Sequence, residues 1–283
     1  MTHETGRFVG VDNTGIFYQS WLPEHPVATV ILVHGYAEHS GRYAHAAAAL
    51  NAGGYAVWAL DHRGHGRSEG PRATVGRFGQ FIADLETFVG LVRSQAPAGP
   101  LFMLGHSMGG LIGTLYAFEH QDQLAGLIMT SPGMKVDDGV SPLLLGLSAA
   151  ISAVAPHLPV GPFDPSGVSR DPNVVAGYLN DPLNYKGGVK ARLGREFTLA
   201  TRGVLPRAPS LKLPILVIQG DADRLVSPAG TYAAFAAFGS ADKTLKKYPG
   251  LYHEVLNEPE QAEILALIRE WLDLRMGGGA PGA

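Results

Sequence analysis

The stretch Gly105-His106-Ser107-Met108-Gly109 decides how this chain is interpreted, because it matches the pattern G-x-S-x-G. In this pattern, small residues two positions before and after the serine permit a strained turn between a strand and a helix. The apolar run Leu101–Leu104 precedes the turn, and Gly109–His120 is typical of a helix after it. That setting lifts a serine hydroxyl clear of a sheet and predicts that Ser107 is a nucleophile. The alternative is a glycine-rich tight turn.

Short apolar runs on both sides of this stretch alternate with helical segments. The strand candidates are Phe17–Trp21, Ala28–Val33, Tyr55–Leu60, Leu101–Leu104, Leu127–Thr130, Pro214–Gln219 and Thr244–Tyr248. The helix candidates are Tyr43–Ala52, Phe78–Ser94, Met108–His120, Thr231–Phe238 and Pro259–Leu274. Nearly continuous apolar runs are typical of strands that are buried on both faces of a parallel sheet. The alternation predicts an α/β fold with a mostly parallel, doubly wound sheet.

One segment breaks this alternation. Between Gly139 and Phe163 there is no Asp, Glu, Lys or Arg, and the apolar helix candidate Leu143–Ala155 is too short to span a bilayer. It is either a buried core helix or a lid with an apolar surface turned to substrate or lipid. We expect residues 1–132 and 209–283 to form the two parts of a core, and residues 133–208 to form an inserted helical cap. The tail Gly277–Ala283 is expected to fray.

Composition and charge narrow the function classes. With 46% hydrophobic residues and a net charge of −3, the chain is expected to be globular and not to bind nucleic acid. It contains no Cys, which excludes disulfides, thiolate metal sites and a cysteine nucleophile. His62 and His65 lack metal-ligand spacing, and no phosphate-binding motif occurs, so neither a metal nor a cofactor is expected. Met1–Arg7 is polar and no long apolar stretch is present, which predicts a cytoplasmic location.

A nucleophilic serine requires a base and an orienting acid, which follow it in the order acid, then histidine, when the serine lies in such a turn. Three histidines follow Ser107 in the chain: His120, His157 and His253. His253 comes after the last strand candidate, and this position favours it as the base. Asp221 and Asp223 both follow the strand candidate Pro214–Gln219. From the residues alone, either aspartate is the candidate acid.

An oxyanion intermediate also requires backbone N–H donors. Met108 directly follows the nucleophile and supplies one of them. The strand candidate Ala28–Val33 is followed by His34-Gly35-Tyr36, which makes the N–H of Tyr36 the second candidate. The alternative is that His34 and Gly35 only form a tight turn.

Several longer motifs extend this pattern over the chain. They are HGYAEHSGRY at 34–43, DHRGHGRS at 61–68, GHSMGG at 105–110, SRDP at 169–172, NDPL at 180–183, GDADRLV at 220–226 and YPGLYHE at 248–254. Together they resemble the monoacylglycerol lipase family of serine α/β-hydrolases, from about residue 15 to 275. The resemblance implies the α/β-hydrolase fold with an inserted cap. It also implies that Ser107, Asp223 and His253 form the catalytic triad, with the N–H groups of Tyr36 and Met108 as the oxyanion hole.

The same resemblance implies a substrate and a head-group site. The expected reaction cleaves monoacylglycerol to glycerol and a fatty acid through an acyl-enzyme, with no cofactor and with transient contact between the cap and membranes or lipid particles. Glu38, Arg42 and Tyr178 would stand near the glycerol; the alternatives are a bracing Glu38–Arg42 salt bridge and ordinary packing of Tyr178. Animal members carry a further His where this chain has Leu256. Rival functions are a broader carboxylesterase or lysophospholipase, and a catalytically silent binding module.

Overall fold

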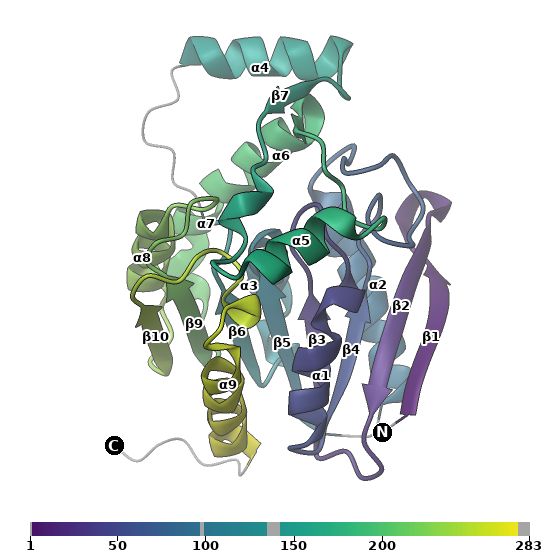
Figure 1. Cartoon of the computed structure of the whole chain (residues 1–283), viewed down its shortest axis with the longest axis vertical. Coiled ribbons are helices and arrows are strands. Elements are labelled where there is room, and N and C mark those ends of the chain that lie inside the picture. The colour runs from purple at the N-terminus through teal and green to yellow at the C-terminus, as the bar shows by residue number, and fades with distance from the viewer. Residues whose placement is uncertain (1, 97–98, 135–141, 277–283) are drawn as a thin grey trace.

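In the computed structural model, which describes residues 2–96, 99–134 and 142–276, the apolar runs form one eight-stranded sheet (Figure 1). Its strands, in spatial order, are β1 (Thr2–Val9), β2 (Gly15–Leu22), β4 (Tyr55–Leu60), β3 (Ala28–Val33), β5 (Leu101–His106), β6 (Gly126–Thr130), β9 (Ile215–Gly220) and β10 (Lys243–Tyr248). From β4 to β10 every neighbouring pair is parallel, whereas β2 runs antiparallel to both β1 and β4. The prediction of a mostly parallel sheet is confirmed.

Helices cover both faces of this sheet. On one face lie α1 (Ala44–Asn51) and α9 (Gln261–Met276), and on the other lie α2 (Gly79–Gln95), α3 (Met108–His120) and α8 (Pro228–Ala237). The side chains of β3 alternate between these two layers: Val30 and Leu32 pack toward α1 and α9, and Ile31 and Val33 pack toward α2 and α3. Because all of them are buried, both faces of the strand are apolar and the run is continuous in the sequence.

The chain between β6 and β9 lies over the carboxyl ends of the strands, and α4 lies farthest from the sheet (Figure 1). Its elements are α4 (Pro142–Val154), β7 (Pro159–Gly161), α5 (Pro172–Asn180), β8 (Val189–Lys190), α6 (Ala191–Arg202) and α7 (Val204–Arg207). Several hydrogen bonds anchor it to the core; for example, Glu196 Oε2 accepts the N–H of Phe78 at 3.0 Å, and the Tyr178 hydroxyl donates to the Ala37 carbonyl at 2.9 Å. We propose residues 133–208 as the cap.

Short 3₁₀ helices complete the described chain. They are Val11–Asn13, Ser40–Tyr43, Gln121–Gln123, Pro165–Gly167, Ala208–Ser210 and Val255–Asn257.

One strand of the eight-stranded sheet has no counterpart in the sequence prediction. β1 forms an edge strand whose residues pair with β2 from Thr2 opposite Leu22 to Val9 opposite Gly15. All of its side chains except that of Phe8 are at least partly exposed, so it carries no alternating apolar pattern. The expected fraying of Gly277–Ala283 concerns residues outside the described ranges.

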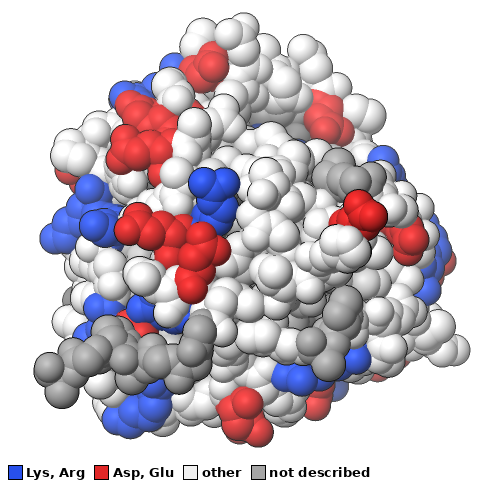
Figure 2. Space-filling model, turned by 90° about the horizontal axis from the view of Figure 1, so that it is seen from below, with Lys and Arg blue, Asp and Glu red and all other residues white. Residues whose placement is uncertain are grey.

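The face opposite the cap carries acidic and basic side chains in small interspersed groups (Figure 2). Across the described residues, no helix combines the length and the apolar character needed to cross a membrane.

Candidate active site

The turn after β5 holds Ser107 in a strained conformation. Ser107 has φ 52° and ψ −118°, and α3 begins at the next residue. A Cβ on Gly109 would lie 2.0 Å from the carbonyl oxygen of Val33, and a Cβ on Gly105 would lie 2.6 Å from the carbonyl oxygen of Gly109. Only glycine fits at these two positions. The strand–turn–helix setting that the sequence predicts is therefore present, with the serine at its apex.

Three side chains from distant parts of the chain meet at this apex. His253, in the loop after β10, places Nε2 2.8 Å from the Ser107 Oγ. On the other side of the ring, its Nδ1 lies 2.7 Å from the Asp223 Oδ2. The exposed fraction of the Ser107 and His253 residues is below a tenth, and the Asp223 side chain is fully buried. A hydrogen-bonded chain of serine, histidine and carboxylate in this order is the arrangement found in serine hydrolases.

The two candidate acids have different surroundings. Asp223 Oδ1 accepts the backbone N–H groups of Leu225 and Val226 at 2.8 and 2.9 Å, which leaves Oδ2 facing His253. Asp221 is exposed and accepts the N–H of Gly250 at 2.6 Å. The structure therefore brings Asp223, and not Asp221, to the histidine.

The electrostatics of this chain suit proton transfer. Burial lowers the pKa of His253, but the charge and hydrogen bond of Asp223 outweigh this effect and raise it above the ordinary value. For Asp223 burial acts in the opposite direction and raises the pKa. The charge and hydrogen bond of His253 and the two backbone donors nevertheless hold the pKa of Asp223 below its usual range. Asp223 is thus ionised at neutral pH and keeps the ring proton on Nδ1. This leaves Nε2 as the ring nitrogen that faces the Ser107 hydroxyl.

A cavity of about 340 Å³ opens beside Ser107. Tyr36 and Met108, the two proposed oxyanion donors, both line it. Met108 is the first residue of α3, where backbone N–H groups have no partner within the helix. The apolar wall comes from both the cap and the core and contains Phe163, Val168, Val189, Leu193, Phe197, Leu225 and Val226. The cavity is therefore suited to an apolar chain that leads to a reactive polar end.

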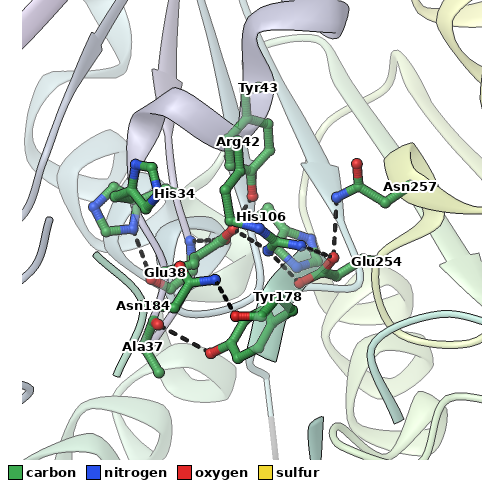
Figure 3. Close-up of polar contacts among 12 residues, drawn as sticks. His34, Ala37, Glu38, Arg42, Tyr43, His106, Tyr178, Asn184, Glu254 and Asn257 are labelled. Atoms are coloured by element: carbon green, nitrogen blue, oxygen red, sulfur yellow. Dashed lines mark hydrogen bonds and ion pairs between the residues drawn. The ribbon is translucent and has the colours of Figure 1, made fainter. Parts of the chain in front are cut away.

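Two carboxylates that share one guanidinium form the polar end (Figure 3). Arg42 Nη1 lies 2.8 Å from Glu38 Oε2 and 2.6 Å from Glu254 Oε1, and its Nη2 lies 2.7 Å from Glu254 Oε2. Glu38 Oε1 also accepts the Tyr43 hydroxyl at 2.6 Å. Burial raises the pKa of Glu38, whereas the Arg42 charge and hydrogen bonds overcome burial at Glu254 and lower its pKa to about 2.

The three residues expected near glycerol take different positions. Glu38 lines the cavity together with Glu254. Arg42 lies between these carboxylates and makes the salt bridge to Glu38 that was the alternative interpretation. Tyr178 is 2% exposed, and the Arg42 guanidinium lies 4.8 Å from its ring centre. Glu38 thus faces the cavity, Arg42 pairs with Glu38, and Tyr178 packs against Arg42.

Sequence reasoning missed three residues of this site. Glu254 directly follows His253 and ends the motif YPGLYHE, but neither position indicated a role for it. His106 lines the cavity with its ring centre 4.8 Å from that of His253, and burial lowers its pKa to about 3. Gln219 is fully buried and donates to Asp223 Oδ2 at 3.2 Å. Its place at the end of a strand candidate gave no indication of a contact with the acid.

Three buried histidines also lie close to one another. The ring centres of His34 and His62 lie 4.3 Å apart, and those of His34 and His65 lie 5.7 Å apart. Within the part of the chain that the structure describes, no group of three or more His, Cys, Asp or Glu side chains is arranged to hold a metal ion.

Comparison with known proteins shows which family this chain resembles. Residues 24–260 match the family described as serine aminopeptidase, S33. The chain is 41% identical over 272 residues to a monoacylglycerol lipase of Mycolicibacterium smegmatis, which covers 96% of this chain and 97% of that protein. It is 37% identical to the human monoglyceride lipase, with 95% and 90% of the two chains covered.

The fold agrees with these matches. The crystal structure of the Paleococcus ferrophilus monoacylglycerol lipase superposes with a TM-score of 0.80 at 28% identity, over 97% of this chain and all of the other. The α/β-hydrolase fold and the family resemblance expected from the sequence are thereby confirmed. The chain belongs to the monoacylglycerol lipase family of serine α/β-hydrolases.

Proposed function

We propose that this protein is a serine ester hydrolase that cleaves monoacylglycerol to glycerol and a free fatty acid. The observation that carries the proposal is the hydrogen-bonded chain Ser107–His253–Asp223 at the base of a cavity with an apolar wall and a carboxylate-lined end. The family relatives named as monoacylglycerol lipases support the same reaction.

The mechanism follows from the positions of these groups. Ser107 Oγ attacks the ester carbonyl carbon while His253 Nε2 takes its proton, and Asp223 stabilises the imidazolium that forms. The N–H groups of Tyr36 and Met108 bind the oxyanion of the tetrahedral intermediate. His253 then protonates the glycerol oxygen as it leaves, and Ser107 retains the acyl group. A water molecule, deprotonated by the same histidine, hydrolyses this acyl-enzyme and releases the fatty acid.

The carboxylate-lined end of the cavity is expected to bind the glycerol head group. Glu38 and Glu254 border the cavity, so their oxygens are the acceptors that glycerol hydroxyls would meet there. Arg42 holds Glu38 and Glu254 in place through its ion pairs, and Tyr178 supports the Arg42 guanidinium with its ring. The acyl chain lies along the apolar wall, which contacts it without demanding a particular hydrogen-bond pattern.

The direct test compares products from equimolar mono-, di- and triacylglycerol and from a lysophospholipid, all with the same acyl chain. Chromatography should show glycerol and fatty acid from monoacylglycerol as the fastest reaction. Faster fatty acid release from the lysophospholipid would favour a lysophospholipase. Equal rates on all four substrates would favour a carboxylesterase of broader specificity.

We further propose that the cap contacts lipid surfaces. Four of its large apolar side chains, Leu147, Val154, Leu158 and Val160, are 50–84% exposed, and α4 is the outermost helix (Figure 1). No charged residue occurs between Gly139 and Phe163. An uncharged surface of this kind is expected to enter the boundary region of a membrane, where substrate is dissolved.

Liposome flotation with paired variants tests this contact. Burial of one large aliphatic side chain contributes about 1.5–3 kcal/mol, so replacing both Leu147 and Val154 by Ser should weaken binding about tenfold or more. Hydrolysis of a soluble short-chain ester should not change. The matched control replaces Val9 on β1 and Leu274 on α9 by Ser. These side chains are 64% and 67% exposed, and the control should bind liposomes normally. Equal weakening by both pairs would contradict a specific contact through the cap.

A further inference from the structure

Two buried side chains hold Gly35 from opposite sides. The Gly35 N–H donates to Glu38 Oε1 at 2.6 Å, and the Gly35 carbonyl oxygen lies 2.7 Å from His34 Nδ1. Figure 3 shows the His34 and Glu38 side chains, and both belong to residues that are at most 2% exposed. The backbone that carries the next residue, Tyr36, is therefore fixed by hydrogen bonds at each end of Gly35.

The tautomer of His34 follows from its other ring nitrogen. The backbone N–H of His62 points at His34 Nε2 at 2.9 Å, and a backbone N–H can only donate. Nε2 is therefore the unprotonated nitrogen, Nδ1 carries the proton, and Nδ1–H donates to the Gly35 carbonyl. Burial, with the neighbouring His62 and His65, lowers the pKa of His34 well below its ordinary value, so the ring remains neutral.

The Gly35 carbonyl and the Tyr36 N–H belong to one peptide group. Resonance links them, because electron density drawn toward the oxygen leaves the nitrogen with more double-bond character and the N–H more positive. A donor at the oxygen thus strengthens a hydrogen bond from the N–H, as in other chains of hydrogen bonds. If His34 only filled space in the core, either ring nitrogen could carry the proton. The proposed role requires the proton on Nδ1.

We propose that His34 is a positioning residue of the oxyanion hole, which orients and polarises the Gly35–Tyr36 peptide through its Nδ1–H. The proposal rests on the proposed function, in which the Tyr36 N–H binds the oxyanion. His34 does not itself touch the substrate. The stronger hydrogen bond from the Tyr36 N–H matters most when negative charge develops on the carbonyl oxygen of the substrate ester. His34 should therefore stabilise the transition state more than the bound ester.

Two variants separate this role from ordinary packing. In His34→Asn, the side-chain amide nitrogen can take the place of Nδ1 and keep the donor to Gly35. In His34→Gln, the longer side chain reaches the place of Nε2 and loses that donor. With a soluble p-nitrophenyl butyrate substrate, the Gln variant should lose about 10- to 100-fold in kcat with KM almost unchanged, less than the 10²–10³ that loss of a whole donor costs. The Asn variant should keep most of the wild-type kcat.

A second readout addresses the oxyanion directly. Affinity for an alkyl boronic acid, which forms a tetrahedral adduct with Ser107, should fall in parallel with kcat in the Gln variant only. Equal losses in both variants, or an unchanged boronate affinity, would overturn the proposal. Because the ester is soluble, a wild-type protein that cleaves it but not monoacylglycerol would refute the proposed substrate and leave this test intact.

Folding defects do not remove the test, because the tautomer is measurable in the wild-type protein. In enzyme labelled with ¹⁵N-histidine, the His34 ring should show a protonated Nδ1 and an unprotonated Nε2 in its nitrogen chemical shifts. A proton on Nε2 would overturn the assignment.

Discussion

Replacing Asp223 by Asn should abolish most activity, because the structure dictates how the new amide would lie. Oδ1 of Asp223 accepts two backbone N–H groups, from Leu225 and Val226, so an oxygen must remain at that position. The amide NH₂ would then take the place of Oδ2, 2.7 Å from His253 Nδ1. A donor at this point requires Nδ1 to accept, which moves the ring proton to Nε2 and prevents His253 from deprotonating Ser107.

The magnitude follows from this change of tautomer. The same exchange in a serine-protease triad lowers kcat about 10⁴-fold, which corresponds to about 5 kcal/mol in the activation free energy. The matched control is Asp221→Asn, since Asp221 is exposed and an amide oxygen can still accept the N–H of Gly250. We expect the control to lose less than about tenfold.

The assay is steady-state hydrolysis of a soluble ester, with thermal unfolding and circular dichroism as checks of the fold. A folded Asp223→Asn protein with near-normal kcat, or an Asp221→Asn protein with the larger loss, would refute the assignment of the acid.

Two further predictions concern the carboxylates around Arg42. Glu254 helps to raise the pKa of His253 against the lowering effect of burial, so Glu254→Gln should move the acidic limb of the pH profile of kcat/KM to lower pH; a move to higher pH would contradict this electrostatic role. Arg42→Met would leave two buried carboxylates without their cation, and urea unfolding at neutral pH should show a loss of about 3–5 kcal/mol in the free energy of unfolding. A loss below about 1 kcal/mol would show that the salt bridges contribute little.

Much of the core was predictable because its strands are buried on both faces. β3 and β4 are continuous apolar runs in the sequence and were expected with the bounds that the structure has. β1 was not predictable in this way, since an exposed edge strand needs no apolar alternation and is held by backbone pairing with β2. The helices α5 and α6 were missed in the loop-rich part of the expected cap for a related reason. In α5 only Tyr178 is buried, and in α6 only Ala191, Leu193, Glu196 and Thr201 are buried, so neither helix has a long apolar stripe.

The site was predictable where chemistry constrains the order of residues along the chain. The glycines around Ser107 and the order of acid and histidine restrict the candidates, but spacing alone left Asp221 and Asp223 equivalent. What separates them is a pair of backbone N–H groups that exists only in the folded turn. Glu254 and Gln219 could not be found for the same reason. Glu254 pairs with Arg42, which is far away in the sequence. Gln219 is near Asp223 in the sequence, but their hydrogen bond depends on the folded turn.

The turnover of monoacylglycerol by Ser107→Ala tests the central claim most directly. Fatty acid release should be measured by chromatography with wild-type and variant enzyme at equal concentrations, after matching thermal unfolding curves show that both are folded. Removing the nucleophile of a triad removes nearly all of its catalysis, so the rate should fall about 10³-fold or more. A folded Ser107→Ala protein that releases fatty acid at the wild-type rate would contradict the serine hydrolase mechanism.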